Sequence, residues 1–487
     1  MKSVSIKPIS WILLVINFNA LFFLAFQFLW GHSRGPSMDM PVFFHSLWFT
    51  IFQGALSAFF CVLVGLIAAP GYARLGSARR VCRWIFLLPN IVSPILAVLS
   101  LVIVFKHFPF GLWGIIVGHI FLNGGLAAIW LGEHWLEIER KWGPINEILG
   151  GRTNFFFRRG VLPLMKKQIA STFAVVFSLC LVSFAVPLVL GGGPQNSTLE
   201  VLIYEGIYTE GDTTSAVFLG LVQCALQFVV FLMILRPTLL KTEYQKVNWQ
   251  TAQLSVKSLW TLPTLVLAGF CLVPLVQLAR MALSHENMSF ASNEIWEATL
   301  NSLAVASSVA SIVFIILGGA GGWGWHKKLI QVPALSGVAV GLAGLLIFKT
   351  WTHGSALYLI FALIWGHLAV VCLPVFRISE PGISMLRAKF ENTLKQMGAS
   401  SFYSFKRVYL KLGFKTYLAG AVLAGCWSMG EFSVSTLMSP RAATLPLYIH
   451  SLLASYRIEA AAGASLTLLA LSVFAMTLFE VLAGGLG

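Results

Sequence analysis

Twelve long apolar stretches recur along the chain, and they constrain its fold more than any other feature. Most contain about 20 residues, the length that an α-helix needs to cross about 30 Å of hydrocarbon. They do not alternate between apolar and polar residues as the strands of a membrane barrel do. The sequence therefore predicts an all-α polytopic membrane protein with about twelve transmembrane helices. The stretches lie near residues 10–30, 45–69, 84–105, 111–131, 169–190, 214–235, 258–282, 298–319, 331–348, 356–375, 416–437 and 462–483.

The composition agrees with this prediction and excludes a soluble enzyme. Apolar residues make up 57% of the chain and charged residues only 10%, whereas a soluble domain has about 25% charged residues. The seven cysteines form no CxxC pair, so neither a zinc site nor a redox dithiol is indicated. The first stretch is longer than the apolar core of a signal peptide, and we interpret it as a retained span.

The excess of Lys and Arg lies mainly in the loops between the apolar stretches. The chain has 33 Lys and Arg against 18 Asp and Glu, a formal charge of +15, which by itself could indicate nucleic acid as a partner. With the N-terminus placed in the cytoplasm, 27 of the 33 basic residues fall in inner segments, as the positive-inside rule requires. The charge therefore predicts topology, with both termini cytoplasmic, and no nucleic-acid partner is expected.

The second half of the chain repeats the first. A shift of 248 residues aligns Gly118-His119 with Gly366-His367, and a shift of 246 residues aligns Cys180 with Cys426. The halves therefore predict two six-helix repeats in the same orientation, a parallel repeat whose interface can hold a substrate path. The expected domains are a first repeat over residues 1–240, a cytoplasmic linker over 241–257 and a second repeat over 258–487.

Each half has its longest inner loop between its fourth and fifth stretches. The loops read PINEILGGRTNFFFRRGVLP from Pro144 and NTLKQMGASSFYSFKRVYLK from Asn392. Each predicts a short helix with an apolar face that ends at a glycine, Gly150 or Gly398, because glycine adopts the positive φ that stops a helix. An apolar face on an inner loop either docks into a partner or lies on the inner leaflet.

These loops resemble the EAA loops of the permease subunits of binding-protein-dependent ABC importers. The family's glutamate is missing from both copies, where Pro144 and Asn392 stand, so the resemblance implies apolar docking onto the ATPase without a salt bridge from that position. The residues that the resemblance assigns to ATPase coupling are Ile145, Leu149, Gly150, Phe157, Arg158 and Arg159 in the first loop and Leu394, Met397, Gly398, Phe405, Lys406 and Arg407 in the second.

The segment FAVPLVLGGGPQNSTLEVLIYEG from Phe184 resembles the fused, double-length permeases of thiamine and ferric-iron importers, and most resembles the thiamine type. That resemblance implies a type I ABC importer permease fold in the bacterial inner membrane, and no cofactor. A separate ATPase is expected, because the chain lacks a phosphate-binding G-x-x-x-x-G-K-[ST] loop. The resemblance to a fused double permease implies two copies of it. A periplasmic binding protein would dock on the outer loops, where Gly191, Gly192, Gly193 and Pro194 are candidate contacts or simply a helix cap.

Polar residues inside the predicted spans are candidates for the substrate path. Glu431 is the first of these, since an ionisable group is costly in a membrane, and its repeat mate under the 246 shift is Ala185. A carboxylate suits a cationic cargo, although a structural acid is the alternative. Asn123 and Gln223 are further candidates. His119 and His367 are predicted to bond helices rather than to form a metal site.

The sequence thus predicts the membrane subunit of an ATP-driven importer that translocates a small cationic solute, with thiamine favoured and ferric iron as the alternative. A secondary transporter of twelve spans is less favoured, because the basic loop 70–83 has no acidic partner. A membrane enzyme is disfavoured, because no loop gathers paired carboxylates, a Ser/His/Asp set or a metal cluster.

Overall fold

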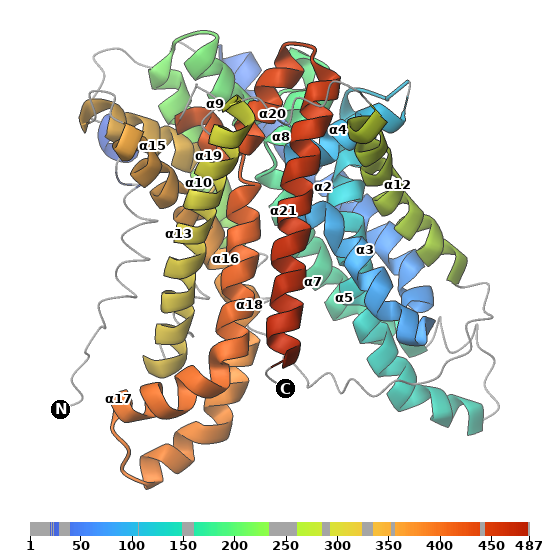
Figure 1. Ribbon diagram of the computed structural model, residues 1–487. Helices are drawn as coiled ribbons and strands as arrows, with labels where there is room; N and C mark the ends of the chain where they lie inside the picture. Colours follow the sequence, from blue (N-terminus) through green and yellow to red (C-terminus); the bar gives the residue numbers. More distant parts are fainter. Residues whose placement is uncertain are drawn as a thin grey trace.

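The protein is a bundle of long helices, and the prediction of an all-α polytopic membrane protein is confirmed (Figure 1). Short helices α8, α9 and α20 lie at one end of the bundle and α17 lies at the other. The computed structural model describes residues 20, 22, 24–28, 39–105, 107–148, 160–232, 261–284, 293–323, 335–351, 356–438 and 444–485.

From the second predicted stretch onwards, each stretch of the first half overlaps one or two helices. The helices of this half are α2 (Met40–Arg74), η1 (Gly76–Ala78), α3 (Arg79–Ile91), α4 (Pro94–Val104), α5 (Leu112–Ile148), α7 (Leu162–Leu181), α8 (Ala185–Leu190), η3 (Pro194–Asn196), α9 (Leu199–Tyr208) and α10 (Thr213–Val230). The second half contains α12 (Leu262–Ser284), α13 (Asn293–Trp323), α15 (Gly337–Trp351), α16 (Ala356–Gln396), α17 (Ser401–Ser404), η6 (Phe405–Tyr409), α18 (Leu410–Met429), α19 (Ser433–Met438), α20 (Leu445–Ala454) and α21 (Ile458–Gly485).

Eight of these helices are long and apolar enough to cross a membrane by themselves: α2, α5, α7, α10, α12, α13, α16 and α21. Helices α3 and α4 together form a ninth candidate span, but they are bent by 106° at their junction. Of the other predicted spans, the first lies mostly outside the described residues. The ninth is the short helix α15, and the eleventh is α18, which is less apolar than the rest.

The third predicted span is therefore not one straight helix. Ser93 precedes Pro94, and its ψ of 136° is extended, because a proline ring clashes with a helical preceding residue. Val92 is extended as well, with ψ of 152°. The chain consequently leaves α3 and re-enters a helix in a new direction at α4.

Helix α18 has a lower hydropathy because two lysines, Lys411 and Lys415, lie in its first two turns together with several small residues. Its small residues permit close approach to neighbouring helices. A Cβ added at Gly420 would collide with Leu317 of α13 and with Ser379 of α16, and one added at Gly425 would lie 3.3 Å from Ala310. The position of α18 is therefore explained by its close contacts with other helices rather than by its hydropathy.

The helix lengths of the two halves match in series. Helices α7 and α18 both have 20 residues and start 248 residues apart, at Leu162 and Leu410. Helices α8 and α19 both have six residues and keep this offset. Helices α9 and α20 both have ten residues and start 246 residues apart, at Leu199 and Leu445. The second half therefore loses two residues after α8.

This series corrects the sequence alignment at one place. The sequence comparison alone places the loss of two residues before Cys180, and so pairs Cys180 with Cys426 and Ala185 with Glu431. With the offset of 248 retained to the end of α8, the mate of Glu431 is Ser183, and Phe432 is the mate of Phe184. The predicted domain limits stay a prediction, since the linker over 241–257 lies outside the described residues.

The two halves share one hydrophobic core and exchange contacts across it. Helix α12, the first described helix of the second half, packs against α2, α3 and α4 of the first half. Its Thr264 hydroxyl donates to the Ala68 carbonyl of α2 over 2.8 Å. Helix α15 in turn packs against α9 and α10. The largest buried cluster contains residues of both halves, so any movement of one half against the other must repack it.

Candidate functional site

Three helix breaks meet where the halves face each other. They separate α3 from α4, α7 from α8 and α18 from α19. The buried Ser93 hydroxyl at the first break donates to the Gly430 carbonyl at the third over 2.9 Å. Phe184 at the second break stacks on Phe432 at the third, with ring centroids 5.6 Å apart and planes 16° apart. Broken helices at a repeat interface are typical of substrate sites in transporters.

Further aromatic side chains pack on both sides of the Phe184–Phe432 pair at this junction. The Tyr204 ring lies 5.6 Å from Phe184 and the His450 ring lies 5.1 Å from Phe432. The Tyr208 hydroxyl donates across the interface to the carbonyls of Thr436 and Leu437, each over 3.0 Å. Phe184 and Phe432 are both fully buried. In this state, aromatic packing closes the junction.

A buried carboxylate that sequence reasoning missed lies beside the junction. Glu200 lies between the predicted spans 169–190 and 214–235, and the structure places it in the first turn of α9 with no exposed surface. Its oxygens accept hydrogen bonds from Gln223 of α10 and from Ser336, each over 2.7 Å. Because Ser336 belongs to the second half, this carboxylate joins the halves. An acid within the otherwise apolar run LEVLIY was the available signal.

Ser336 explains how a carboxylate is tolerated in this interior. Its hydroxyl accepts from the Ala339 amide over 3.1 Å, so it caps the N-terminus of α15. A helix N-terminus carries partial positive charge and favours a nearby anion. Glu200 is therefore stabilised by hydrogen bonds and by the helix dipole.

Glu431 lies at the same place from the opposite side. Its Oε1 accepts from the amides of Ser433 and Val434, over 2.9 and 3.2 Å, at the start of α19. A Cβ added at Gly337, the first residue of α15, would lie 3.3 Å from this oxygen. Glu431 is thus a capping residue, as its structural alternative proposed, and two carboxylates flank the start of α15.

The remaining predicted path residues separate into two groups. Gln223 lies at the junction, because its amide donates both to Glu200 and to the Leu181 carbonyl, the latter over 3.0 Å. Asn123 is buried elsewhere, with its amide 4.0 Å from the Cys180 sulfur. The structure gives Asn123 no hydrogen bond to either carboxylate among its described contacts.

The two predicted histidines bond helices to each other. His119 Nδ1 lies 2.9 Å from the Ser57 hydroxyl, which joins α5 to α2. His367 Nδ1 lies 2.9 Å from the Ser428 hydroxyl and its Nε2 lies 3.1 Å from that of Ser435. Both imidazoles are buried. These contacts agree with the helix-bonding interpretation.

The inner loop of the second half exposes an apolar surface. Helix α16 continues beyond the membrane-spanning part to Gln396, and Gly398 ends it with φ of +65°, as predicted. Two backbone hydrogen bonds close this end. The Gly398 amide donates to the Lys395 carbonyl over 3.1 Å, and the Ala399 amide donates to the Leu394 carbonyl over 3.0 Å. This is a Schellman motif, which needs the left-handed backbone that glycine provides.

The exposed side chains of this loop only partly match the prediction. Met397 is 75% exposed, whereas Leu394 is half-buried. Phe402 and Tyr403 of α17 are 65% and 56% exposed and were not predicted. Phe405 instead packs its ring against Gly322 of α13, which anchors the loop. Lys406 and Arg407 are exposed.

The first inner loop is described only in part. Ile145 is 46% exposed and Ile148 is 84% exposed, at the end of α5. The predicted short helix is therefore continuous with the fourth span. The predicted residues Leu149, Gly150, Phe157, Arg158 and Arg159 lie outside the described residues.

The glycines of the first outer loop form a turn against the α4–α5 connection. The Gly111 backbone amide donates to the Leu190 carbonyl over 2.8 Å, and the Asn196 side-chain amide donates to the Gly191 carbonyl over the same distance. Gly192 and Gly193 have φ of +72° and +133°, so they do end α8. They are also exposed, as is Pro194.

Two further groups of the outer segments stand out. Burial raises the pKa of the Glu205 carboxyl above its ordinary value, and the nearby Glu210 raises it further.

Tyr456 is 89% exposed and has φ of +58°, which is uncommon for a residue with a side chain. It occupies the position after α20 where a glycine is usual. An exposed aromatic in strained backbone favours a contact role.

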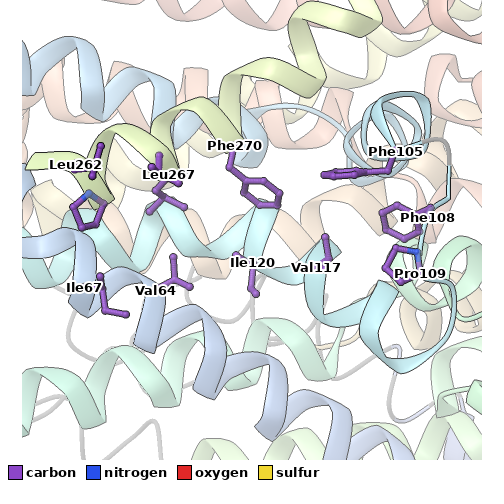
Figure 2. Close-up of a pocket in the computed structure, with 12 residues that line it drawn as sticks. Val64, Ile67, Phe105, Phe108, Pro109, Val117, Ile120, Leu262, Leu267 and Phe270 are labelled. Carbon is purple, nitrogen blue, oxygen red and sulfur yellow. The ribbon is translucent and has the colours of Figure 1, made fainter.

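A groove of about 620 Å³ lies apart from this junction (Figure 2). Its walls are apolar and come from α2, α5, α12 and the segment between α4 and α5. Because a cation is poorly solvated in such a groove, it is not a candidate for the path of a charged cargo. The lining residues are Val64, Ile67, Phe105, Phe108, Pro109, Val117, Ile120, Leu262, Pro263, Val266, Leu267 and Phe270.

Comparison with known proteins supports the resemblance seen in the sequence. The "Thiamine transport system permease protein ThiP" of Escherichia coli (strain K12) is 27% identical over 483 residues, which cover 90% of this chain and 89% of that protein. The resemblance to fused ABC importer permeases of the thiamine type is confirmed. Proteins of the same name from Salmonella typhimurium and Haemophilus influenzae are each 26% identical, over 90% and 72% of this chain and 89% and 69% of their own lengths. No protein-family model matches the chain.

The alignment with these thiamine permeases covers both halves of the chain. The chain is a multi-pass membrane protein similar to transport permeases.

Proposed function

We propose that this chain is the permease subunit of an ATP-driven ABC importer in the bacterial inner membrane, and that its cargo is thiamine. The observation that carries the proposal is similarity to thiamine transport permeases over nine-tenths of the chain. Thiamine is a cation with aromatic rings. The junction between the halves offers aromatic rings and two carboxylates, which suit such a cargo.

The orientation that supports this proposal places α17 in the cytoplasm and α9 and α20 in the periplasm. Both termini are then cytoplasmic, in agreement with the distribution of Lys and Arg. Helix α17 and the ends of α5 and α16, which lie at the cytoplasmic end, carry or adjoin the exposed apolar side chains Ile148, Met397 and Phe402. Each inner loop inserts these side chains into one of two ATPase subunits, because apolar surface gains free energy when it leaves water.

The junction is the proposed path of the cargo. Closure of the ATPase dimer moves the inner loops, and the halves rock about their shared core. Phe184 then separates from Phe432, and the side chains of Glu200 and Glu431 become accessible to the passing cation as hydrogen-bond and ion-pair partners. The outer loops receive a periplasmic binding protein, with Gly192 and Tyr456 as exposed contacts.

The test is uptake by the reconstituted system. We would place the chain in proteoliposomes with its ATPase and supply the binding protein loaded with radiolabelled thiamine. The expected result is uptake that requires internal ATP and is unaffected by ionophores. Uptake driven by an ion gradient without the ATPase would contradict the proposal. Uptake of ferric iron but not of thiamine would agree with an importer permease but contradict the assigned cargo.

A further inference from the structure

The apolar groove has the size and the place of a ligand site. Its volume of about 620 Å³ is within the range of about 300–1,000 Å³ that is usual for small-molecule sites. Helices α2, α5 and α12, which provide most of its lining, are all candidate membrane spans. The groove therefore lies at membrane depth, where the surrounding solvent is lipid.

The groove follows the long axis of the spans (Figure 2). Ile67 and Leu262 line one end and Phe105 and Phe108 line the other. Ile67 is two turns from the end of α2 at Arg74, and Leu262 is the first residue of α12. In the orientation proposed above, on which this inference rests, that end faces the inner leaflet.

Basic side chains follow at the inner end. The hydrogen bond from Thr264 to Ala68 holds the start of α12 against the last turns of α2. The chain then turns through η1, and Arg79 and Arg80 begin α3, which also packs against α12. Arg80 is exposed, whereas Arg74 is engaged by Glu139 over 2.7 Å. Cations at the cytoplasmic side of a cleft between spans attract anionic lipid headgroups.

We propose that the groove binds one acyl chain of an anionic phospholipid of the inner leaflet, whose phosphate is held by Arg79 and Arg80. The apolar lining excludes the cationic cargo as its occupant. The described part of the first helix is excluded as well, because Leu24 and Phe28 lie beside Gly220 and Phe218 of α10.

The lipid would join the two halves of the protein. Its acyl chain contacts α2 and α5 of the first half and α12 of the second. A lipid held between two bodies stabilises the arrangement in which it fits best. Its binding is therefore expected to depend on the conformation of the permease.

The test counts retained lipid and needs no transport, so it is independent of the proposed function. The purified full-length chain is exchanged into detergent with phosphatidylglycerol or phosphatidylcholine of identical acyl chains, and bound lipid is counted by native mass spectrometry. The expected result is one phosphatidylglycerol per chain. Val266→Trp, which fills the groove, is expected to reduce retention roughly tenfold, a loss of about 1.4 kcal/mol.

A matched control separates the groove from the general surface. Ile315 of α13 is 64% exposed, as is Val266, but does not line the groove. Ile315→Trp is expected to leave retention unchanged. Ile67→Trp is the second groove variant should Val266→Trp fail to elute as a single species. Equal retention by wild type and both groove variants would overturn the acyl-chain site.

The headgroup is tested separately. Arg80→Gln is expected to remove the preference for phosphatidylglycerol over phosphatidylcholine. Equal binding of the two lipids by the wild-type chain would overturn the assignment of the phosphate to the arginines.

Discussion

Glu431 combines a capping role with a charge, and a conservative substitution separates the two. An amide oxygen in Glu431→Gln can still accept from the Ser433 and Val434 amides, so the fold is expected to stay intact. Loss of the carboxylate beside the cargo is expected to raise the KM for thiamine roughly tenfold, which corresponds to about 1.4 kcal/mol. The measurement is uptake against substrate concentration in proteoliposomes.

The control for this prediction is Glu431→Ala, which removes the cap as well. It is expected to cost about 1 kcal/mol of stability, seen as a lower thermal midpoint. If Glu431→Gln transports thiamine with the wild-type KM, Glu431 is a cap alone.

Tyr456 has a backbone conformation that is unfavourable for a residue with a side chain. Its positive φ costs about 1 kcal/mol relative to glycine, so Tyr456→Gly is expected to preserve or raise the thermal midpoint. The same variant removes an aromatic side chain that is 89% exposed. We therefore expect weaker stimulation of ATP hydrolysis by the loaded binding protein, measured in nanodiscs, and restoration by Tyr456→Phe. Full stimulation in Tyr456→Gly would exclude this contact.

At the scale of the element, the end of α16 depends on one backbone conformation. A Cβ at Gly398 would meet no atom within 4 Å, so only its φ of +65° opposes a side chain. Gly398→Val is expected to reshape this end, because a β-branched residue tolerates positive φ poorly. The exposed Met397 would then be displaced. We expect lower affinity for the ATPase, measured by co-purification, and slower uptake.

The glycine of α21 offers a matched control. Gly463 also has open space around its Cβ, but its φ lies outside the positive range. Gly463→Val is therefore expected to leave ATPase binding intact. Equal loss in both variants would point to general destabilisation rather than to the end of α16.

The elements also show which kinds of structure the sequence could predict. Long apolar stretches predicted α2, α5 and α16, and the glycine in the inner loop predicted the end at Gly398, because each depends on local chemistry. Helix α18 was marked as a span, but its packing depends on small residues that meet other helices. The bend between α3 and α4 was missed, although Pro94 signalled it.

At the scale of the whole molecule, the junction could be predicted only in part. Glu431 and Gln223 were identified as polar residues in apolar spans, and both lie there. Glu200 was missed because its burial arises from contacts with Ser336, 136 residues away. The stack of Phe184 on Phe432 likewise needs both halves. Hydropathy carries no information on such pairs, since it averages over neighbours in the chain.

The contact between the breaks makes the motion of the halves testable. A Cβ at Gly430 would lie 3.5 Å from the Ser93 Cβ, at the short end of the range of about 3.5–4.5 Å that a disulfide spans. The double variant Ser93→Cys/Gly430→Cys is therefore expected to form a disulfide with copper phenanthroline, which ties α3–α4 to α18–α19. If the halves separate at this junction in each cycle, oxidation abolishes uptake and dithiothreitol restores it.

The single variants control for the oxidant and for the native thiols. All seven native cysteines are buried, so Ser93→Cys and Gly430→Cys alone are expected to be insensitive to oxidation. Because Gly430 lies close to the backbone of Ser93, activity of the reduced double variant must be measured first. Uptake that continues at the wild-type rate with the disulfide fully formed would show that the junction stays closed during transport, and the path would have to lie elsewhere between the halves.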